Sequence, residues 1–488
     1  MKTDSIINNF QGITVLVLGD TILDVYLDGT STRLSPEAPV PVVDVQQERY
    51  FMGGAANVAV NLNALGARVT FCSVIGNDDG GRRVIQRLGS LGIRTDTIIS
   101  APERSTIVKE RIMSASQLIA RFDRGTENPL QHSTEELLIA QIRKAYPICD
   151  AMIIADYDKG ILTSGIIESL AMLRGVTAPF LAIDSRRLGV FRKLHPSIVK
   201  PNYREAINLL ALKPKVKDRV IQLKNKAQAL QRATGSKLAV VTLDADGAIA
   251  FNTEKMVCHA YPPAVAHPHV IGAGDTFMSA LTLALVCQAN TSEAIKLSLA
   301  AASVSVSKEN TACCSGLELR SFFVHQRKYV PSLDELREIC NLYRRQGRKI
   351  VFTNGCFDIL HSGHVNYLNE ARKLGDVMIV GINNDDSIHR LKGAGRPINP
   401  IRDRIEVVGG LGAVDHITAF GRPDNDTPLE LIEAIRPDIF VKGGDYAEKN
   451  LPEAPYVKKF GGQVHFIPFL PDHSTSGVIR RIQAAILQ

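Results

Sequence analysis

The chain has 488 residues, of which 45% are hydrophobic, 22% are charged and none is tryptophan. This length exceeds one ordinary hydrophobic core and favours two to four compact units, of which we expect two. The net charge of +7 is spread along the chain without a basic tail, which fits phosphorylated small substrates better than nucleic acid.

The eight cysteines are scattered, apart from the adjacent Cys313 and Cys314, and none forms a C-x-x-C pair. This spacing favours reduced thiols over a zinc site or a disulfide framework. No run of eighteen apolar residues offers a membrane span, and the polar residues before the first apolar run do not fit a secretory signal. We therefore expect a cytoplasmic protein with no membrane partner.

Apolar, strand-like runs alternate with amphipathic helical segments in the first part of the chain. Strands are expected at residues 15–18, 69–75, 151–155 and 180–183, and helices at about 54–65 and 82–91. This alternation predicts an α/β domain with a parallel sheet covered by helices on both faces. Residues 39–45 and 106–122 break the alternation and predict an antiparallel β flap at a sheet edge.

A glycine-rich turn, Gly272-Ala273-Gly274, opens a helix of small and apolar residues. Backbone N–H groups at such a turn can hold the negative charge of a transferring phosphoryl group. Asp275, in the first helical turn, can take the proton of an attacking hydroxyl and is the candidate catalytic base. An aspartate at this position can also serve only as a helix cap.

Polar residues and glycines precede this turn in a recognisable order. Across roughly residues 11–320 the order resembles the ribokinase-like (PfkB-type) sugar kinases. The resemblance implies that sugar hydroxyls bind to Asp20, Gly53, Gly54 and Asn57. It also implies ATP and phosphate contacts from Asn202, Tyr203, Arg204, Glu205, Thr242, Gly247, Gly272, Ala273 and Gly274. Mg²⁺ would be held through water without direct protein ligands, with Glu205 as the candidate.

The pattern departs from that kinase family just before the glycine turn. The family usually reads D-x-T-G-A-G-D, whereas this chain has His269 and Ile271 at the first and third positions. This departure weakens the case for a monovalent-cation site and for the family's standard loop geometry there, and the residues do not decide whether the protein depends on such a cation. Four polar residues end two of the expected strands at the same sheet edge, and we assign them no role: Asp156, Asp158, Lys159 and Asp184.

The domain boundary lies between about residues 318 and 348. Ser332 and Glu335 are spaced as a capping box at a helix start, and apolar residues at helical spacing continue the helix to about Gly347. We expect a ribokinase-like domain at residues 1–330, a linker helix at 331–347 and a second domain at 348–488.

Strands expected at residues 349–353, 377–382, 416–419 and 439–441 again alternate with helices and predict a compact Rossmann-like domain. The first of these strands is followed by His361-Ser-Gly-His364 and a helix from about Gly363. Both imidazoles can face a triphosphate, because free N–H groups and the helix dipole favour anions at a helix N-terminus. They could also be helix caps without chemistry.

The H-x-G-H turn resembles the signature of the nucleotidyltransferases related to cytidylyltransferases. The resemblance implies that His361, His364 and Lys392 stabilise the reacting phosphates. Asn354, Ser474, Thr475 and Ser476 would bind phosphate, with Arg402, Arg404 and the turn at residues 442–445 as further pieces of the site. Asp358 could equally well only stabilise its turn.

A sugar kinase followed by a nucleotidyltransferase, with the segments 34–43 and 390–399, resembles the bifunctional heptose kinases and adenylyltransferases of lipopolysaccharide synthesis over nearly all of the chain. The resemblance implies phosphorylation of D-glycero-β-D-manno-heptose 7-phosphate at C1 by ATP. AMP would then pass from ATP to the heptose 1-phosphate, giving ADP-heptose and pyrophosphate. It further implies Mg²⁺ and a homodimer formed through the flap strands, whose sheet edge would otherwise be exposed.

Three alternatives stay open on the residues alone. A fused kinase and cytidylyltransferase could act on another phosphorylated sugar or polyol. A nucleotide-regulated binding protein with an inactive kinase half is suggested only by His269 and Ile271. Nucleic-acid binding through the basic balance would show strong salt dependence. The residues themselves specify neither the sugar nor the nucleotide.

Overall fold

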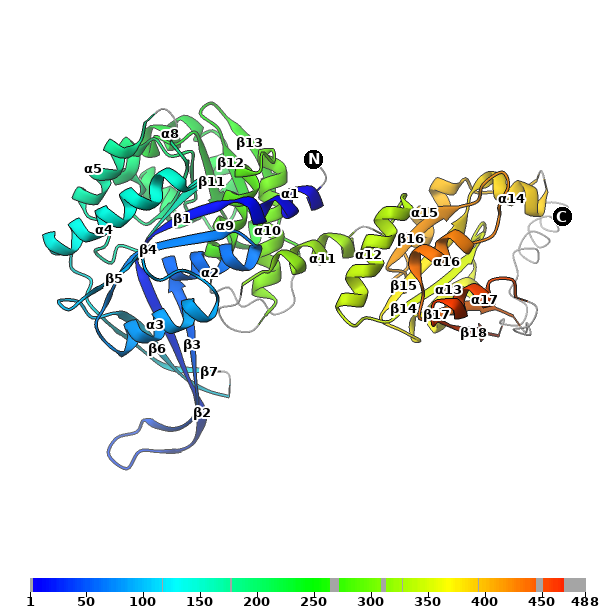
Figure 1. Ribbon diagram of the computed structural model, residues 1–488, viewed down its shortest axis with the longest axis horizontal. Helices are drawn as coiled ribbons and strands as arrows, with labels where there is room; N and C mark the ends of the chain where they lie inside the picture. Colours follow the sequence, from blue (N-terminus) through cyan, green and yellow to red (C-terminus); the bar gives the residue numbers. More distant parts are fainter. Residues whose placement is uncertain are drawn as a thin grey trace. The chain divides into compact units, whose positions relative to one another are not determined.

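The computed structural model describes residues 3–115, 117–175, 178–263, 272–308, 313–326, 328–393, 395–444 and 451–468. The chain divides into two compact units, Met1–Arg320 and Ser321–Gln488, which are described separately. Figure 1 shows their helices and strands. The domain limits at residues 330 and 347 stay predictions.

The first unit is built on a nine-stranded sheet in the order β13-β12-β11-β10-β9-β8-β1-β4-β5. The strands from β5 to β11 are parallel, and apolar side chains of its central strands, such as Leu16, Ile154 and Ile183, are fully buried. β12 and β13 add an antiparallel hairpin that the sequence analysis did not predict. The strands are β1 (Thr14–Gly19), β4 (Arg68–Gly76), β5 (Ile98–Ala101), β8 (Ala151–Asp156), β9 (Phe180–Ser185), β10 (Ile198–Val199), β11 (Leu238–Thr242), β12 (Ala248–Phe251) and β13 (Met256–Ala260).

Two of the helices position the candidate kinase site, because α2 packs against α9 and each begins directly after a glycine with positive φ, Gly54 or Gly272. The helices of this unit are α1 (Thr3–Asn9), α2 (Ala55–Leu65), α3 (Asp79–Ser90), α4 (His132–Ala145), α5 (Ser164–Leu173), α6 (Tyr203–Leu209), α7 (Arg219–Leu223), α8 (Ala227–Thr234), α9 (Ala273–Val286) and α10 (Thr291–Val306); α11 (Gly316–Gln326) begins in it. Short 3₁₀ turns are η1 (Phe10–Gly12), η2 (Tyr146–Ile148), η3 (Leu188–Leu194) and η4 (Asp244–Asp246).

The flap is a separate four-stranded sheet in the order β3-β2-β6-β7, which extends away from the body of the first unit in Figure 1. Its strands are β2 (Thr21–Leu34), β3 (Pro41–Gly54), β6 (Ile107–Ser114) and β7 (Gln117–Arg124). The expectation of an antiparallel flap is wrong for one pair, since β2 and β6 run parallel with Ile22 opposite Ile107. β2 comes from the hairpin β2–β3 and β6 from the hairpin β6–β7. Because these hairpins are distant in the sequence, the local sequence pattern does not reveal how β2 and β6 pair.

The second unit contains a parallel sheet in the order β16-β15-β14-β17-β18. The chain moves outward from β14 through β15 to β16 and then returns to β17, so the strand order reverses beside β14, where such sheets bind ligands. The elements are β14 (Ile350–Gly355), β15 (Val377–Asn383), β16 (His416–Phe420), β17 (Ile439–Gly443), β18 (Gln463–Ile467), α13 (Ser362–Arg372), α14 (Asp385–Lys392), α15 (Ile401–Gly409), α16 (Leu429–Ile435) and α17 (Ala454–Lys459).

The expected boundary helix is α12 (Leu333–Arg345), and its apolar face belongs to the core of the second unit. The Tyr343 hydroxyl and His416 Nε2 lie 2.7 Å apart in a buried hydrogen bond. The predicted capping box is wrong, because Ser332 occupies the N-cap position but its side chain makes no capping hydrogen bond. Among the described residues, no helix is both long and apolar enough to cross a membrane.

Two candidate active sites

Asp275 is 8% exposed in the first turn of α9 and is held by two hydrogen bonds. The Tyr157 hydroxyl donates to its Oδ1 at 2.5 Å, and Asn57 Nδ2 donates to its Oδ2 at 2.7 Å. Burial raises the pKa of Asp275 to about 6, although both hydrogen bonds oppose the rise. A buried carboxylate with a pKa near neutrality is suited to accept a proton from a hydroxyl.

Asp20 is completely buried and organises the loop that follows β8, which also carries Tyr157. Its carboxylate accepts backbone N–H hydrogen bonds from Tyr157 at 2.7 Å, Lys159 at 3.2 Å and Ile161 at 3.3 Å. Burial and repulsion from Asp156 raise the pKa of Asp20 to about 6. Asp20 therefore shapes the site through the loop, and its contact with a sugar stays a prediction.

The two glycines before α2 are required by close packing of the backbone. A Cβ at Gly54 would lie 2.4 Å from the backbone oxygen of Asp20, and one at Gly53 would lie 2.3 Å from Asp24 Oδ2. Gly54 also has a φ of +60°, which favours glycine. The two glycines therefore let the start of α2 pack closely against Asp20 and Asp24.

Lys200 and Asp184 form a buried ion pair that the sequence analysis missed. Lys200 Nζ lies 2.9 Å from Asp184 Oδ2, and a Cβ at Gly274 would lie 3.5 Å from the same Nζ atom. Burial opposes the charge of Lys200, but Asp184 keeps the Lys200 pKa raised. The ammonium group thus adjoins the glycine turn, where a phosphoryl group would carry negative charge. The position of both residues at strand ends was the available signal.

The fold brings only some of the residues predicted to contact the nucleotide close to one another. A bridge between Asn202 and Thr242 joins two of them, and Asn202 forms a capping box with Glu205 at the start of α6. The Tyr203 side chain is buried, and its hydroxyl bonds Gln222 and the N–H of Lys215 instead of facing a site. Arg204 is exposed, and Gly247 has a positive φ in a turn so tight that a Cβ would lie 2.0 Å from the Ala260 oxygen.

The described residues contain no group of three or more His, Cys, Asp or Glu side chains placed to hold a metal directly. Burial raises the pKa of Glu205, and repulsion by Asp184 adds to the rise. A hydrated Mg²⁺ ion would relieve this repulsion, and Mg²⁺ commonly binds through one or two carboxylates while keeping several waters. The residues present therefore fit such an ion.

The remaining strand-end residues of the first unit have structural partners. Arg187 binds the carboxylates of Asp156 at 3.1 Å and Asp158 at 2.9 Å. Lys159 pairs with Glu127. His269 and Ile271 lie outside the described residues.

In the second unit, His361 is the N-cap of α13 and His364 lies in its first turn. The two ring centroids are 4.0 Å apart, and the His364 ring packs against Phe357 at 5.5 Å. His364 Nδ1 is buried and has no hydrogen-bond partner within the described part of the chain. Burial, with the charges of His361 and Lys392, lowers the pKa of His364 to about 4. The imidazole is therefore neutral at pH 7 and available as a hydrogen-bond donor.

Asn354 and Lys442 face each other at the point where the strand order reverses. Lys442 Nζ donates to Asn354 Oδ1 at 2.9 Å and lies 3.2 Å from Glu453 Oε1. The two residues end β14 and β17, which are neighbours in the sheet. Lys442 thus adds a cation to the predicted site. Ser474, Thr475 and Ser476 lie outside the described residues, as does residue 445 of the turn.

Asp358 and Arg404 hold the backbone around the histidine turn. Asp358 accepts hydrogen bonds from the N–H groups of Ile398 and Asn399 and lies 2.6 Å from Arg396 Nε. Burial opposes its ionisation, but these groups hold the pKa of Asp358 below its usual range. Arg404 is buried and donates to the carbonyl oxygens of Cys356 and Asn383 and to Asp385. Arg402 has no such network among the described contacts.

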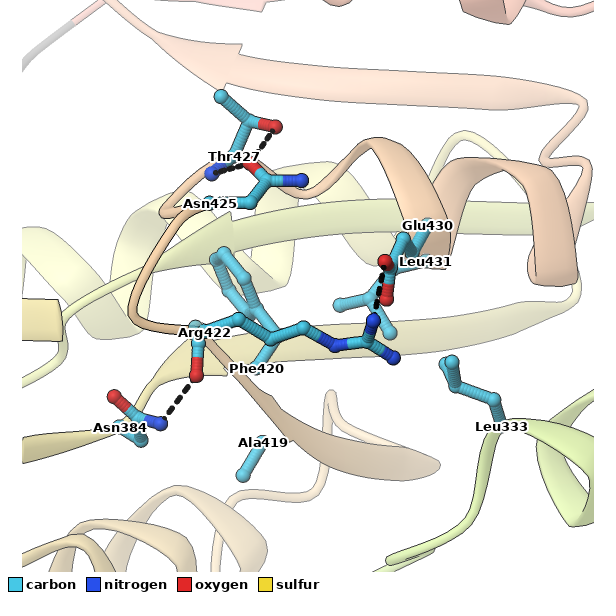
Figure 2. Close-up of a pocket in the computed structure, with 10 residues that line it drawn as sticks. Leu333, Asn384, Ala419, Phe420, Arg422, Asn425, Thr427, Glu430 and Leu431 are labelled. Atoms are coloured by element: carbon cyan, nitrogen blue, oxygen red, sulfur yellow. Dashed lines mark hydrogen bonds and ion pairs between the residues drawn. The ribbon is translucent and has the colours of Figure 1, made fainter.

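A pocket of about 240 Å³ lies elsewhere in the second unit, at the end of β16 (Figure 2). Arg422 Nη1 lies 3.0 Å from Glu430 Oε1 at its wall. Neither His361 nor His364 lines it, so it is distinct from the histidine turn. Its lining residues are Leu333, Asn384, Ala419, Phe420, Gly421, Arg422, Asn425, Thr427, Glu430 and Leu431.

Comparison with known proteins agrees with this division of the chain. Residues 13–316 match the family model described as pfkB family carbohydrate kinase, and residues 352–481 match the one described as Cytidylyltransferase-like. A relative from Wolinella succinogenes named Bifunctional protein HldE is 38% identical over 481 residues, covering 97% of this chain and 98% of the relative. One of the same name from Helicobacter pylori (strain J99) is 38% identical over 469 residues, covering 96% of this chain and 98% of the relative.

Solved structures that resemble the first unit share its fold at low sequence identity. Phosphofructokinase-2 from Escherichia coli, in complex with substrates and products, has a TM-score of 0.53 and 20% identity, covering 64% of this chain and 98% of that chain. Ribokinase from Arabidopsis thaliana, complexed with ribose and ATP, has a TM-score of 0.50 and 18% identity with the same two coverages of 64% and 98%. The predicted ribokinase-like fold is confirmed.

Proposed function

Because the chain belongs to the family of bifunctional HldE proteins, we propose which of its residues carry out each of the two reactions. The protein is a carbohydrate kinase and an adenylyltransferase of ADP-heptose synthesis for lipopolysaccharide. ATP phosphorylates D-glycero-β-D-manno-heptose 7-phosphate at C1, and AMP is then transferred from ATP to D-glycero-β-D-manno-heptose 1-phosphate. We assign the kinase to residues 1–330 and the adenylyltransferase to residues 348–488, joined by 331–347.

In the kinase reaction, Asp275 takes the proton of the anomeric hydroxyl as that oxygen attacks the γ-phosphorus of ATP and ADP leaves. The observation that carries this assignment is the buried carboxylate directly after the glycine turn, with a pKa raised to about 6. The N–H groups of residues 272–274 and the ammonium of Lys200 stabilise the transferring phosphoryl group. Asp20, Gly53, Gly54 and Asn57 form the sugar side of the site.

On the nucleotide side of the kinase, Asn202, Glu205 and Thr242 lie near the phosphates, together with the backbone from Tyr203 to Arg204 and at Gly247. Asp184 and Glu205 would hold a hydrated Mg²⁺ ion through its water molecules. When bound, the ion would supply positive charge that neutralises the phosphate oxygens.

In the adenylyltransferase reaction, the heptose 1-phosphate is already an anionic nucleophile, so no strong base is required. One of its oxygens attacks the α-phosphorus of ATP, and pyrophosphate leaves. His361 and His364 donate hydrogen bonds to the reacting phosphates, while Lys392 and Lys442 supply positive charge. Asn354 orients Lys442, and Ser474, Thr475 and Ser476 contact phosphate.

Phosphorus NMR of the purified protein tests both reactions at once. With Mg-ATP and the heptose 7-phosphate we expect ADP and an anomeric bisphosphate; after addition of heptose 1-phosphate we expect pyrophosphate and a diphosphate-linked sugar nucleotide. Replacing ATP by CTP in the second step distinguishes the alternative of a cytidylyltransferase. A folded protein that turned over neither heptose would contradict the proposed substrates.

We also propose a cytoplasmic homodimer formed through the flap. Large apolar side chains are exposed on its strands and turns, including Leu34 at 64%, Leu118 at 51% and Phe122 at 54%. A second flap would cover this surface and the free edges of the sheet. Light scattering of the native protein should give a dimer mass, and Phe122→Glu should give the monomer. A monomeric native protein would contradict the proposal.

A further inference from the structure

Tyr157 connects the two buried carboxylates of the kinase site, and none of the sequence motifs pointed to it. It lies in the loop after β8, where its N–H donates to Asp20 Oδ2 at 2.7 Å. Its hydroxyl reaches the other way and donates to Asp275 Oδ1 at 2.5 Å. A single residue thus fixes the distance between the residue proposed to shape the sugar side and the proposed base.

The charged groups around Asp275 come from several elements. Asp184 at the end of β9 repels its charge, and Lys200, before α6, favours it. Asn57 from α2 and Tyr157 favour it by hydrogen bonds, but burial is the largest influence and raises the Asp275 pKa to about 6. The Tyr157 bond is therefore one of few contacts that keep this carboxylate ionised near neutral pH.

The phenol itself remains protonated throughout the working range of pH. Burial, with the charges of Asp275 and Asp184, raises the pKa of Tyr157 well above its ordinary value, although Arg186 opposes the rise. Tyr157 is thus a permanent donor and does not compete for the substrate proton. Each carboxylate oxygen can accept two hydrogen bonds, so both existing bonds leave room for an incoming hydroxyl.

We propose that Tyr157 is a positioning residue of the kinase reaction, whose hydroxyl keeps the Asp275 carboxylate ionised and oriented toward the anomeric hydroxyl of the sugar. Its backbone N–H holds the same loop on Asp20, so that the base and the sugar side move as one unit. The inference rests on the proposed role of Asp275 as the base. The transferred proton goes from the sugar hydroxyl to Asp275, and Tyr157 keeps its own.

The test is the pH profile of kinase kcat/KM for Tyr157→Phe in the full-length protein. Loss of one hydrogen bond to an ionised carboxylate should move the acid limb upward by about one pH unit. The loss of rate should therefore be larger at pH 6 than at pH 8.5, and adenylyl transfer should be unchanged. Tyr146→Phe is the matched control, since the hydroxyl of this buried tyrosine is influenced by Arg174 and Cys149 and by neither carboxylate of the site.

A second substitution keeps the hydroxyl and should shift the acid limb of the kinase pH profile in the opposite direction. In Tyr157→3-fluorotyrosine the phenol is a stronger donor, so the acid limb should move to lower pH. An acid limb that stays in place in both folded variants would overturn the role of Tyr157. Asp275→Asn, measured alongside, separates the two hypotheses: retained kinase turnover would instead refute the base itself.

Discussion

Lys200 Nζ lies 2.9 Å from Asp184 Oδ2, at the carboxyl ends of the neighbouring strands β10 and β9. Both groups are largely buried, and the ammonium adjoins the glycine turn at Gly274. This ion pair places one fixed positive charge beside the site where a phosphoryl group would be transferred. Its partner, Asp184, repels the charge of Asp275, so the pair also influences the proposed base.

Lys200→Met should therefore impair the kinase in two ways. The loss of a preorganised positive charge should lower kinase kcat/KM on the order of 100-fold. Leaving Asp184 without its partner should also destabilise the first unit by about 2–3 kcal/mol. Steady-state kinetics and thermal unfolding measure the two effects. As a control, Lys193→Met removes an exposed lysine that pairs with Glu168 at 3.4 Å. This variant should keep the kinase kcat/KM and the thermal stability of the native protein. A kinase loss below threefold would contradict the assignment.

Asp275→Asn should abolish kinase turnover, because the amide cannot accept the hydroxyl proton. Pyrophosphate release from ATP and heptose 1-phosphate should stay near normal, since Asp275 belongs to the first compact unit and the histidine turn to the second. Coupled assays for ADP and for pyrophosphate on the same preparation measure both. Loss of both activities from a folded protein would show that the two units do not work independently.

His364→Ala should have the converse effect. Removing a hydrogen-bond donor to the reacting phosphates should lower adenylyl transfer on the order of 100-fold and leave the kinase unchanged. His389→Ala, on α14, is the control for loss of an exposed histidine in the same unit. Activity within twofold of the native protein would mean that His364 is mostly a structural part of the turn.

The pH dependence of adenylyl transfer tests the charge state of His364. Because burial, His361 and Lys392 lower its pKa to about 4, the free enzyme carries a neutral imidazole above about pH 5. Titration of His364 should therefore cause no change in kcat/KM for ATP between pH 6 and pH 8. The measurement is the pH profile of kcat/KM for ATP in adenylyl transfer, compared between the native protein and His364→Gln. An inflection near pH 6.5 that the variant lacks would show that His364 acts as a cation.

The central sheet strands were predictable because β1, β4, β8 and β9 are short apolar runs buried on both faces. The long strand β2 was not, since its outer half is exposed and polar and its partners β3 and β6 are set by tertiary pairing. The strands β12, β13 and β18 were also missed. Each has only four or five residues, too few to show a clear hydrophobic periodicity.

In the candidate sites, too, some residues could be named from the sequence and others could not. Asp275 and Asn57 could be named because each follows a glycine at a helix start, and the structure joins them by a 2.7 Å hydrogen bond. Tyr157 could not, because its contact with Asp275 spans 118 residues of sequence and depends on how the β8 loop packs. Lys200 was overlooked since an isolated lysine before a helix usually faces solvent.

The raised pKa of Asp275 also predicts a pH-dependent cost to the stability of the first unit. Its pKa of about 6 in the folded protein exceeds the ordinary value of an aspartate, 3.8, so folding favours the protonated form. The corresponding stabilisation is complete below the unfolded pKa and is lost as pH rises through the folded pKa. About two pKa units correspond to about 3 kcal/mol lost by pH 7, an upper limit for this buried group.

Asp275→Asn removes this titration, so its stability relative to the native protein should increase between pH 4.5 and pH 7 and then level off. Calorimetric unfolding of both proteins across this range, with the transition of the first unit followed separately, measures the difference. Asp44→Asn, an exposed aspartate of the flap, should show no such trend. A difference that stayed constant with pH, or that fell as pH rose, would mean that burial does not raise the pKa of Asp275, and the acid limb of the kinase would need another origin.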